Sequence, residues 1–185
     1  GGLTVDGTLV TTSSSGSTSD TIILLNGTQT IDGSGEIFLN DDLDNFMRPA
    51  ADGQTVTVGS DLTIRGAGFL GSDVGGWLNQ GTILAQGNNR LTIDPDSAQS
   101  FINQGTLAAE GPGGLYLAAG AYTNTGSTIE ARDGSNLSMA NGSTITGGNL
   151  STTGSGNITP EGGAALSGVT VSANSVFNIN NGIAL

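Results

Sequence analysis

The sequence predicts an all-β fold, a parallel β-solenoid in which short strands and turns stack into successive rungs. Glycine contributes 32 of the 185 residues, and because glycine costs about 1 kcal/mol at a helix-interior position, a mostly helical fold is excluded. The apolar residues occur in short β-branched clusters, such as 21–25, 55–58 and 62–64, bounded by glycine, asparagine, aspartate or serine, which is typical of strands. Strands and turns recur together at about 21 residues, which favours a solenoid over an antiparallel sandwich.

The whole chain, 1–185, is predicted to be one solenoid domain with an irregular beginning. Residues 1–60 repeat poorly: 11–20 form a low-complexity polar loop, and 40–54 are expected to leave the solenoid as a longer excursion with one helical turn. Residues 61–185 carry the regular repeats, with a smaller insertion at 94–100. At about 21 residues per rung, the chain length corresponds to about eight to nine rungs.

One arm of the repeat consists of an aromatic residue, an Asn-x-Gly turn, and then threonine with an apolar strand. It occurs at 77–85 and 101–109 and, with an inserted residue, at 121–131. Glycine and asparagine tolerate positive φ, so we expect them at the corners of the rungs. The predicted turn positions are Asn79, Gly81, Asn103, Gly105, Asn124 and Gly126. The aromatic residues Trp77, Phe101 and Tyr122 are expected to stack inside or along one corner; a sugar-binding platform is the alternative.

A second arm supplies the expected interior. Four strand-like segments at 90–93, 114–117, 136–139 and 157–159 follow one another at intervals of 24, 22 and 21 residues. Because alternate side chains of a strand point to opposite faces, the apolar members should stack in register in the core. The predicted interior stacks are Leu91, Leu115 and Leu137, and beside them Ile93, Leu117 and Met139.

Composition excludes several classes of function. The chain has no cysteine, histidine or lysine, so thiolate and imidazole chemistry, zinc fingers and a Ser-His-Asp triad are excluded. Four arginines against sixteen acidic residues give a net charge of −12, which argues against nucleic acid as a partner. No apolar run approaches the ~18 residues of a transmembrane segment. An acidic chain rich in threonine, asparagine and glycine, beginning with Gly-Gly, is expected to be a processed, secreted or cell-surface protein.

The best candidate for a metal site is the acid-rich stretch Asn40, Asp41, Asp42, Asp44 and Asn45. Calcium binds six to eight oxygen ligands, and alternating Asp and Asn side chains on a short loop supply several. The stretch lacks the EF-hand pattern, so a solvated loop or a helix N-terminus is the competing interpretation. Calcium is the only cofactor that the sequence suggests.

An enzyme is the less favoured alternative. Glycoside hydrolysis needs two carboxylates about 5–9 Å apart, and Asp94 with Asp96, or Asp41, Asp42 and Asp44, are the candidates. The four arginines lie far apart in the sequence and no cluster of aromatic residues offers a sugar platform. We therefore predict a protein that is not an enzyme and assign no catalytic residue. An ice-binding face is also disfavoured, because the Thr-x-Thr pairs do not recur at one rung position.

The repeats resemble a known family. The segments at 26–37 (Asn-Gly-Thr-Gln-Thr-Ile-Asp-Gly-Ser-Gly-Glu-Ile), 62–68 and 145–150, together with the Asn-Gln-Gly-Thr repeats, are similar to the degenerate β-helix repeats of giant bacterial surface proteins, the autotransporter and filamentous-haemagglutinin-like adhesins. The resemblance covers about residues 21–185 and implies a right-handed β-helix. It further implies a structural role as an adhesin stalk, a matrix scaffold or a filament building block.

The ends of such a solenoid are unpaired β edges that recruit further strands. The sequence closes on an apolar, strand-like segment, 178–185, without a polar cap. We therefore expect end-to-end stacking with neighbouring repeats or identical subunits. Two alternatives stay open, a glycan- or calcium-binding adhesion module that contacts a host or cell surface, and a polysaccharide-degrading enzyme.

Overall fold

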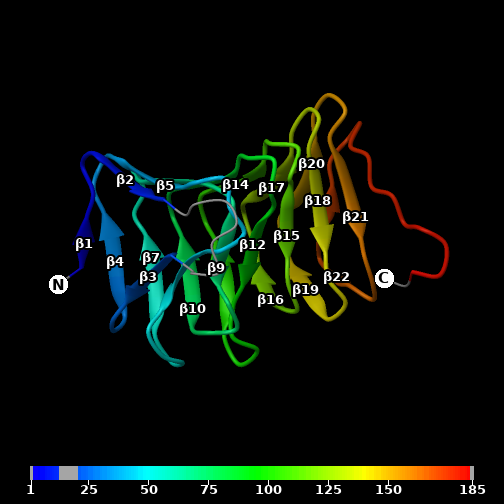
Figure 1. Cartoon of the computed structure of the whole chain (residues 1–185). Helices are drawn as coiled ribbons and strands as arrows, with labels where there is room; N and C mark the ends of the chain where they lie inside the picture. The colour runs from blue at the N-terminus through cyan, green and yellow to red at the C-terminus, as the bar shows by residue number, and fades with distance from the viewer. Residues whose placement is uncertain (1, 13–20, 184–185) are drawn as a thin grey trace.

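The computed structural model describes residues 2–12 and 21–183 and has the form of a parallel β-solenoid, with the two ends of the chain at opposite ends of the stack (Figure 1). Its strands form three parallel sheets, here called A, B and C. Sheet A contains β1 (Leu3–Thr4), β4 (Gln29–Asp32), β7 (Thr55–Val58), β10 (Gly76–Asn79), β13 (Ser100–Asn103), β16 (Gly120–Thr123), β19 (Ser143–Thr146) and β22 (Ala165–Ser167). Sheet B contains β2 (Thr8–Thr11), β5 (Glu36–Leu39), β8 (Thr63–Gly66), β11 (Thr82–Ala85), β14 (Thr106–Ala109), β17 (Thr128–Ala131), β20 (Asn149–Thr152) and β23 (Thr170–Val171). Sheet C contains β3 (Thr21–Leu25), β6 (Asn45–Pro49), β9 (Gly68–Gly71), β12 (Leu91–Asp94), β15 (Leu115–Leu117), β18 (Asn136–Met139) and β21 (Asn157–Pro160).

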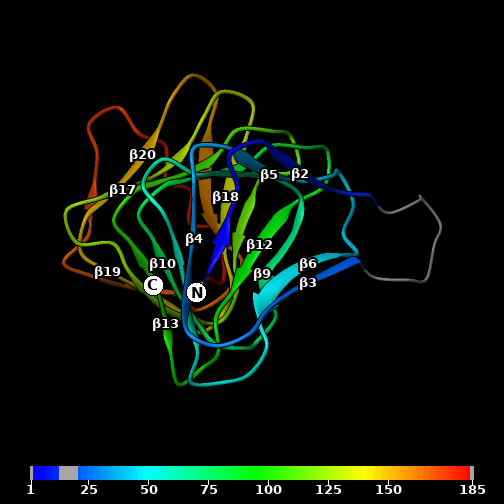
Figure 2. The same ribbon diagram turned by 90° about the vertical axis from the view of Figure 1, so that its left-hand side faces the viewer.

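Each turn of the solenoid contributes one strand to each sheet, in the order A, B, C. About seven turns of about 21–23 residues result, close to the expected number. A shorter last turn adds β22, β23 and an isolated parallel bridge between Ile158 and Phe177. Seen from the N-terminal end in Figure 2, the chain passes clockwise from sheet A through sheet B to sheet C as it recedes, so the solenoid is right-handed.

The core is a set of apolar stacks along the solenoid axis. Leu91 pairs in register with Leu115, and Leu115 with Leu137, while Ile93, Leu117 and Met139 form the neighbouring row. All six side chains are at most 1% exposed. A strand with one face in the core alternates buried and exposed side chains, and the burial of β7, β8 and β11 follows that alternation.

The repeated aromatic residues lie inside the solenoid. Trp77, Phe101 and Tyr122 are in register on β10, β13 and β16, and each is at most 2% exposed. The Tyr122 hydroxyl lies 2.8 Å from the carbonyl oxygen of Ile93 and 2.9 Å from that of Ala118. Burial raises the pKa of Tyr122 well above its usual value. These rings belong to the core and form no surface platform.

The prediction that residues 40–54 leave the solenoid is wrong, because they contain β6, which pairs with β3 and β9 in sheet C. Alternation explains the strand: Asn45, Met47 and Pro49 are buried, while Phe46 and Arg48 point outward. Asparagine and proline at inward positions hid this pattern from sequence analysis. The predicted polar loop 11–20 falls mostly on residues outside the described ranges.

The predicted glycine corners arise from two different causes. Gly126 has a φ of +80°, and a Cβ there would meet nothing within 4 Å. Gly81 and Gly105, in contrast, do not have the positive φ of the left-handed region. A Cβ on Gly81 would lie 2.3 Å from the carbonyl oxygen of Gly59, and one on Gly105 would lie 2.1 Å from that of Gly81. These two positions need glycine because the backbones of successive turns approach too closely for a side chain.

The three asparagines of the same corner point inward. Asn79, Asn103 and Asn124 are at most 1% exposed and lie where sheet A passes into sheet B. Asn79 donates from Nδ2 to the Asn103 Oδ1 at 2.9 Å, and Asn103 donates in the same way to Asn124 at 2.9 Å. They form a buried hydrogen-bonded ladder along the axis.

Candidate functional surfaces

The acid-rich stretch 40–45 is a hydrogen-bonded corner between sheets B and C. Asn40 accepts a hydrogen bond from the Asp41 amide at its Oδ1, and Asp42 accepts one from the Asp44 amide at 3.0 Å. Asn45 is fully buried and donates to the carbonyl oxygens of Asn40 and Asp42. Several oxygens expected to bind calcium therefore hold the corner itself. Within the described ranges, no cluster of three or more acidic side chains is placed to hold a metal ion.

Asp41 joins this corner to a later turn. Its carboxylate accepts hydrogen bonds from the Asn89 amide at 2.8 Å and from the Asn88 side chain at 3.0 Å, and its carbonyl oxygen accepts one from the Asn89 side chain. Burial alone would raise the pKa of Asp41, but these hydrogen bonds outweigh it and the pKa is lowered. Asp41 thus positions the segment at Asn88 and Asn89 as an ionised carboxylate.

Asp94 and Asp96, the predicted acid pair, have different neighbours in the structure and different roles. Asp96 accepts a hydrogen bond from the Ala98 amide at 2.9 Å and shapes the connection to β13. Asp94, at the end of β12, faces Asp73, which sequence analysis did not associate with it. Burial first, and the charge of Asp73 second, raise the pKa of the Asp94 carboxyl. Asp73 and Asp94 both line a pocket of about 590 Å³ at the corner between sheets C and A.

The two ends of the solenoid expose positions that belong to its core. In the first turn, Leu3, Leu9 and Ile23 are in register with the fully buried Ile31, Ile37 and Met47. In the last turn, Leu166, Val171 and Phe177 are in register with the fully buried Ile145, Leu150 and Ile158. All six terminal residues keep some solvent exposure, and Val171 reaches 41%. Among the described residues, the core therefore continues to both ends without a covering layer.

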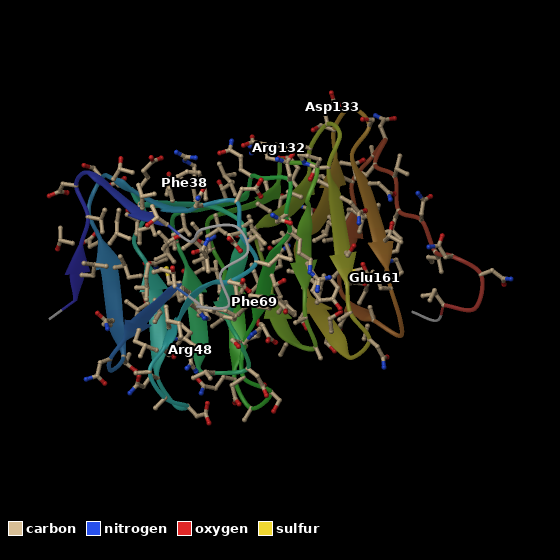
Figure 3. The ribbon with its side chains drawn as sticks, in the orientation of Figure 1. Phe38, Arg48, Phe69, Arg132, Asp133 and Glu161 are labelled. Carbon is tan, nitrogen blue, oxygen red and sulfur yellow. The ribbon has the colours of Figure 1, made fainter. Side chains whose placement is uncertain are left out.

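The four arginines divide into two kinds. Arg65 on β8 pairs with Glu36 at 2.8 Å and lies over the Phe38 ring, and its hydrogen bond lowers the pKa of Glu36. Arg132 pairs with Glu110 at 2.6 Å and Glu130 at 2.8 Å. Arg90 stacks on the Tyr116 ring at 4.4 Å, and neither Arg90 nor Arg48 has a carboxylate partner among the described residues. In Figure 3, Phe38 and Arg132 lie along the upper side over sheet B, and Phe69 and Arg48 lie lower, over sheet C.

The outer face of sheet C carries an apolar and aromatic row that sequence analysis missed. Ile22, Phe46, Phe69, Thr92 and Tyr116 are in register on successive strands. The Phe46 and Phe69 rings stack with centroids 4.8 Å apart and planes 9° apart. A groove of about 360 Å³ lies beside this row, lined by Leu43, Phe69, Asn88, Asn89, Arg90 and Gly113. The available signal was the pair Phe46 and Phe69, one turn apart in the sequence. It was overlooked because β6 was not predicted as a strand.

Comparisons with known proteins return no match, whether with protein-family models, with curated proteins or with solved structures. The fold therefore stands on the strand register alone. Within the described ranges, no helix is both long and apolar enough to cross a membrane.

Proposed function

We propose that this chain is a structural, non-catalytic solenoid that stacks end to end and serves as a stalk, scaffold or filament unit. The observation that carries the proposal is the partial exposure of the interior rows at both ends of the described part of the chain. Each of the three interior rows that is fully buried in the neighbouring turn ends on a partly exposed apolar residue, at both ends of the stack. A further turn placed on either end would bury them.

The geometry of the ends favours continuation along the axis. Within the part of the chain that the structure describes, the outermost strands β1, β2 and β3 each have a partner on one side only, as do β22 and β23. Unpaired N–H and C=O groups on such edges are templates for another strand. A second copy set on the last turn would bring β1 against β22 and β2 against β23, with the parallel direction and interior alternation preserved. Burying a side chain such as Leu9 or Val171 contributes about 1.5–3 kcal/mol, so several together supply a substantial contact.

The same proposal places the protein outside the cell or at its surface. An acidic chain without cysteine or lysine, together with repeats resembling those of bacterial adhesins, supports this location. Fractionation of the source cells with an antibody against the chain is the test. Recovery from the medium or from the outer surface is expected, and recovery from the cytosol alone would contradict the location without touching the stacking.

Stacking is tested by sedimentation velocity and small-angle X-ray scattering over a concentration series. The expected result is a mass that increases with concentration at constant cross-sectional radius. Val171→Asp places a charge on the interior position of the last turn and should leave only monomer. Val10→Asp is the matched control, because Val10 is 48% exposed on the outer side of β2. A wild-type chain that stays monomeric throughout, or equal effects of the two variants, would overturn the proposal.

A further inference from the structure

The groove on the outer face of sheet C has the features of a small-ligand site. Binding pockets for small ligands enclose about 300–1,000 Å³ and combine apolar or aromatic walls with a few polar groups. This groove, of about 360 Å³, has Phe69 and Leu43 as apolar walls, and Asn88, Asn89 and Arg90 as polar groups. Leu43 is 43% exposed, so its side chain is not part of the buried core.

The aromatic residues beside the groove form a firm support. Phe69 is backed by the stacked Phe46, and Tyr116 carries the Arg90 guanidinium at 4.4 Å. Between them on the same row lies Thr92, which is 2% exposed, and its Oγ1 has no hydrogen-bond partner among the described residues. An arginine stacked on a ring keeps its N–H donors in one plane, which matches a planar carboxylate.

Charge distinguishes this face from the rest of the molecule. The net charge is −12, yet Arg90 and Arg48 are both on this side, and neither is neutralised by a carboxylate within the described ranges. Acidic residues do lie near the groove wall: the Asp41 carboxylate accepts hydrogen bonds from Asn88 and Asn89, and Leu43 stands between Asp42 and Asp44 in the sequence. Repulsion from more distant acids is screened over about 8–10 Å at physiological salt. Of the residues that line the groove, Arg90 alone is charged, so an anionic group is expected to bind at its guanidinium, on the side away from Asp41.

We propose that this groove binds an acidic polysaccharide, with a sugar carboxylate on Arg90, the sugar ring against Phe69, and its hydroxyls on Asn88 and Asn89. An acidic peptide is the less suitable occupant. The strands of sheet C beside the groove, β9 and β12, are each paired on both sides, so a peptide could not add strand hydrogen bonds there. Rings, amides and a guanidinium match a ligand that is itself ring-shaped, hydroxylated and charged. This lateral site does not depend on the stacking of the ends.

The test is calorimetric titration of the full chain with alginate oligosaccharides as the uronate probe, and with dextran and poly-glutamate as neutral and non-sugar anionic probes. Binding of alginate alone is expected. Arg90→Gln should weaken it by about tenfold or more, the usual size of a lost hydrogen bond to a charged group, and Phe69→Ala should weaken it measurably. The matched control is Arg65→Gln, which removes an arginine that also lies over a ring but is paired with Glu36, and it should leave the affinity within about twofold.

Several outcomes would overturn the proposal. These are no binding of alginate by the wild-type chain, equal binding of dextran or poly-glutamate, or equal losses in Arg90→Gln and Arg65→Gln. The titration is repeated with the Val171→Asp variant, whose ends should not stack. Retained alginate binding there would separate the groove from the ends, so that each proposal can fail without the other. Circular dichroism of every variant verifies that the strands are intact.

Discussion

The Asn79 side chain donates a hydrogen bond to the Asn103 Oδ1, 2.9 Å away in the next turn, at a position where both residues are buried. Asn103 makes the same bond to Asn124, which ends the row by donating to main-chain oxygens of Ser127 and Asn149. The row begins at Asn79 because the preceding turn has Val58 at this position, and the Asn79 Oδ1 accordingly has no hydrogen-bond partner in the described part of the chain. A polar line of this kind inside an apolar core fixes the register of each turn on the next.

Asn103→Ala is predicted to destabilise the solenoid by about 2–3 kcal/mol. The change removes two ladder bonds and leaves the buried Asn124 Oδ1 without its donor, and a buried unsatisfied group carries a penalty of about 1–3 kcal/mol. Urea unfolding followed by circular dichroism measures the difference. Asn157→Ala is the matched control, since Asn157 is the middle of a partly exposed ladder with Asn136 and Asn178. A control that costs as much as Asn103→Ala would contradict the importance of burial.

Gly105→Ala is predicted to destabilise the fold more than Gly126→Ala. A methyl group at 105 meets a carbonyl oxygen at 2.1 Å and forces the turns apart, whereas one at 126 meets nothing and adds only the strain of a positive φ. That strain amounts to about 1–2 kcal/mol. Thermal melts of the two variants decide the order. A smaller loss at 105 would show that close stacking is not the reason for glycine there.

Asp94→Asn is predicted to stabilise the protein, and to do so more at pH 7 than at pH 3. The folded-state pKa of Asp94 is raised above 3.8, first by burial and then by Asp73. The contribution of Asp94 to wild-type stability is therefore greatest below its unfolded pKa and falls as the pH rises through its folded pKa. Asparagine removes that penalty. Melting midpoints of both proteins between pH 3 and pH 7 should diverge with rising pH, and a constant difference would contradict the shift.

Tyr122→Phe is predicted to cost about 0.5–1.5 kcal/mol, the net contribution of a neutral hydrogen bond. Only the hydroxyl contacts to the Ile93 and Ala118 carbonyl oxygens are lost, since the phenyl ring keeps its place beside Phe101. Chemical denaturation measures the loss. In the same samples, alkaline titration of tyrosine absorbance should show one residue that ionises only on unfolding, because burial raises its pKa. Reversible ionisation of Tyr122 in the folded protein would contradict this.

The period of the sequence was sufficient to predict the solenoid, because the stacking of Leu91, Leu115 and Leu137 depends only on spacing and alternation. Features that depend on contacts between neighbouring turns could not be predicted from the sequence. The pairing of Asp73 with Asp94 joins residues one turn apart at a corner, and the Asn79 ladder requires knowing that a turn residue points inward.

The missed strand β6 has a similar cause. Asn45 and Pro49 are polar or conformationally restricted residues at inward positions, and only the partners β3 and β9 identify the strand. Its loss from the prediction also concealed Phe46 and hence the outer row of sheet C. The acid-rich loop was recognised, but the Asn88 and Asn89 donors that occupy Asp41 lie 47 and 48 residues away.

The most direct test of end-to-end stacking is a disulfide between copies. The chain has no cysteine, so Leu9→Cys with Val171→Cys introduces one thiol at the interior position of each end. Neighbouring strands lie about 4.8 Å apart, within the Cα separation of a disulfide. Mild oxidation should produce a ladder of linked oligomers on a non-reducing gel. The Val10→Cys and Val171→Cys pair, whose thiols face opposite sides, should produce none. Monomer alone from the first pair, or equal ladders from both, would contradict the account.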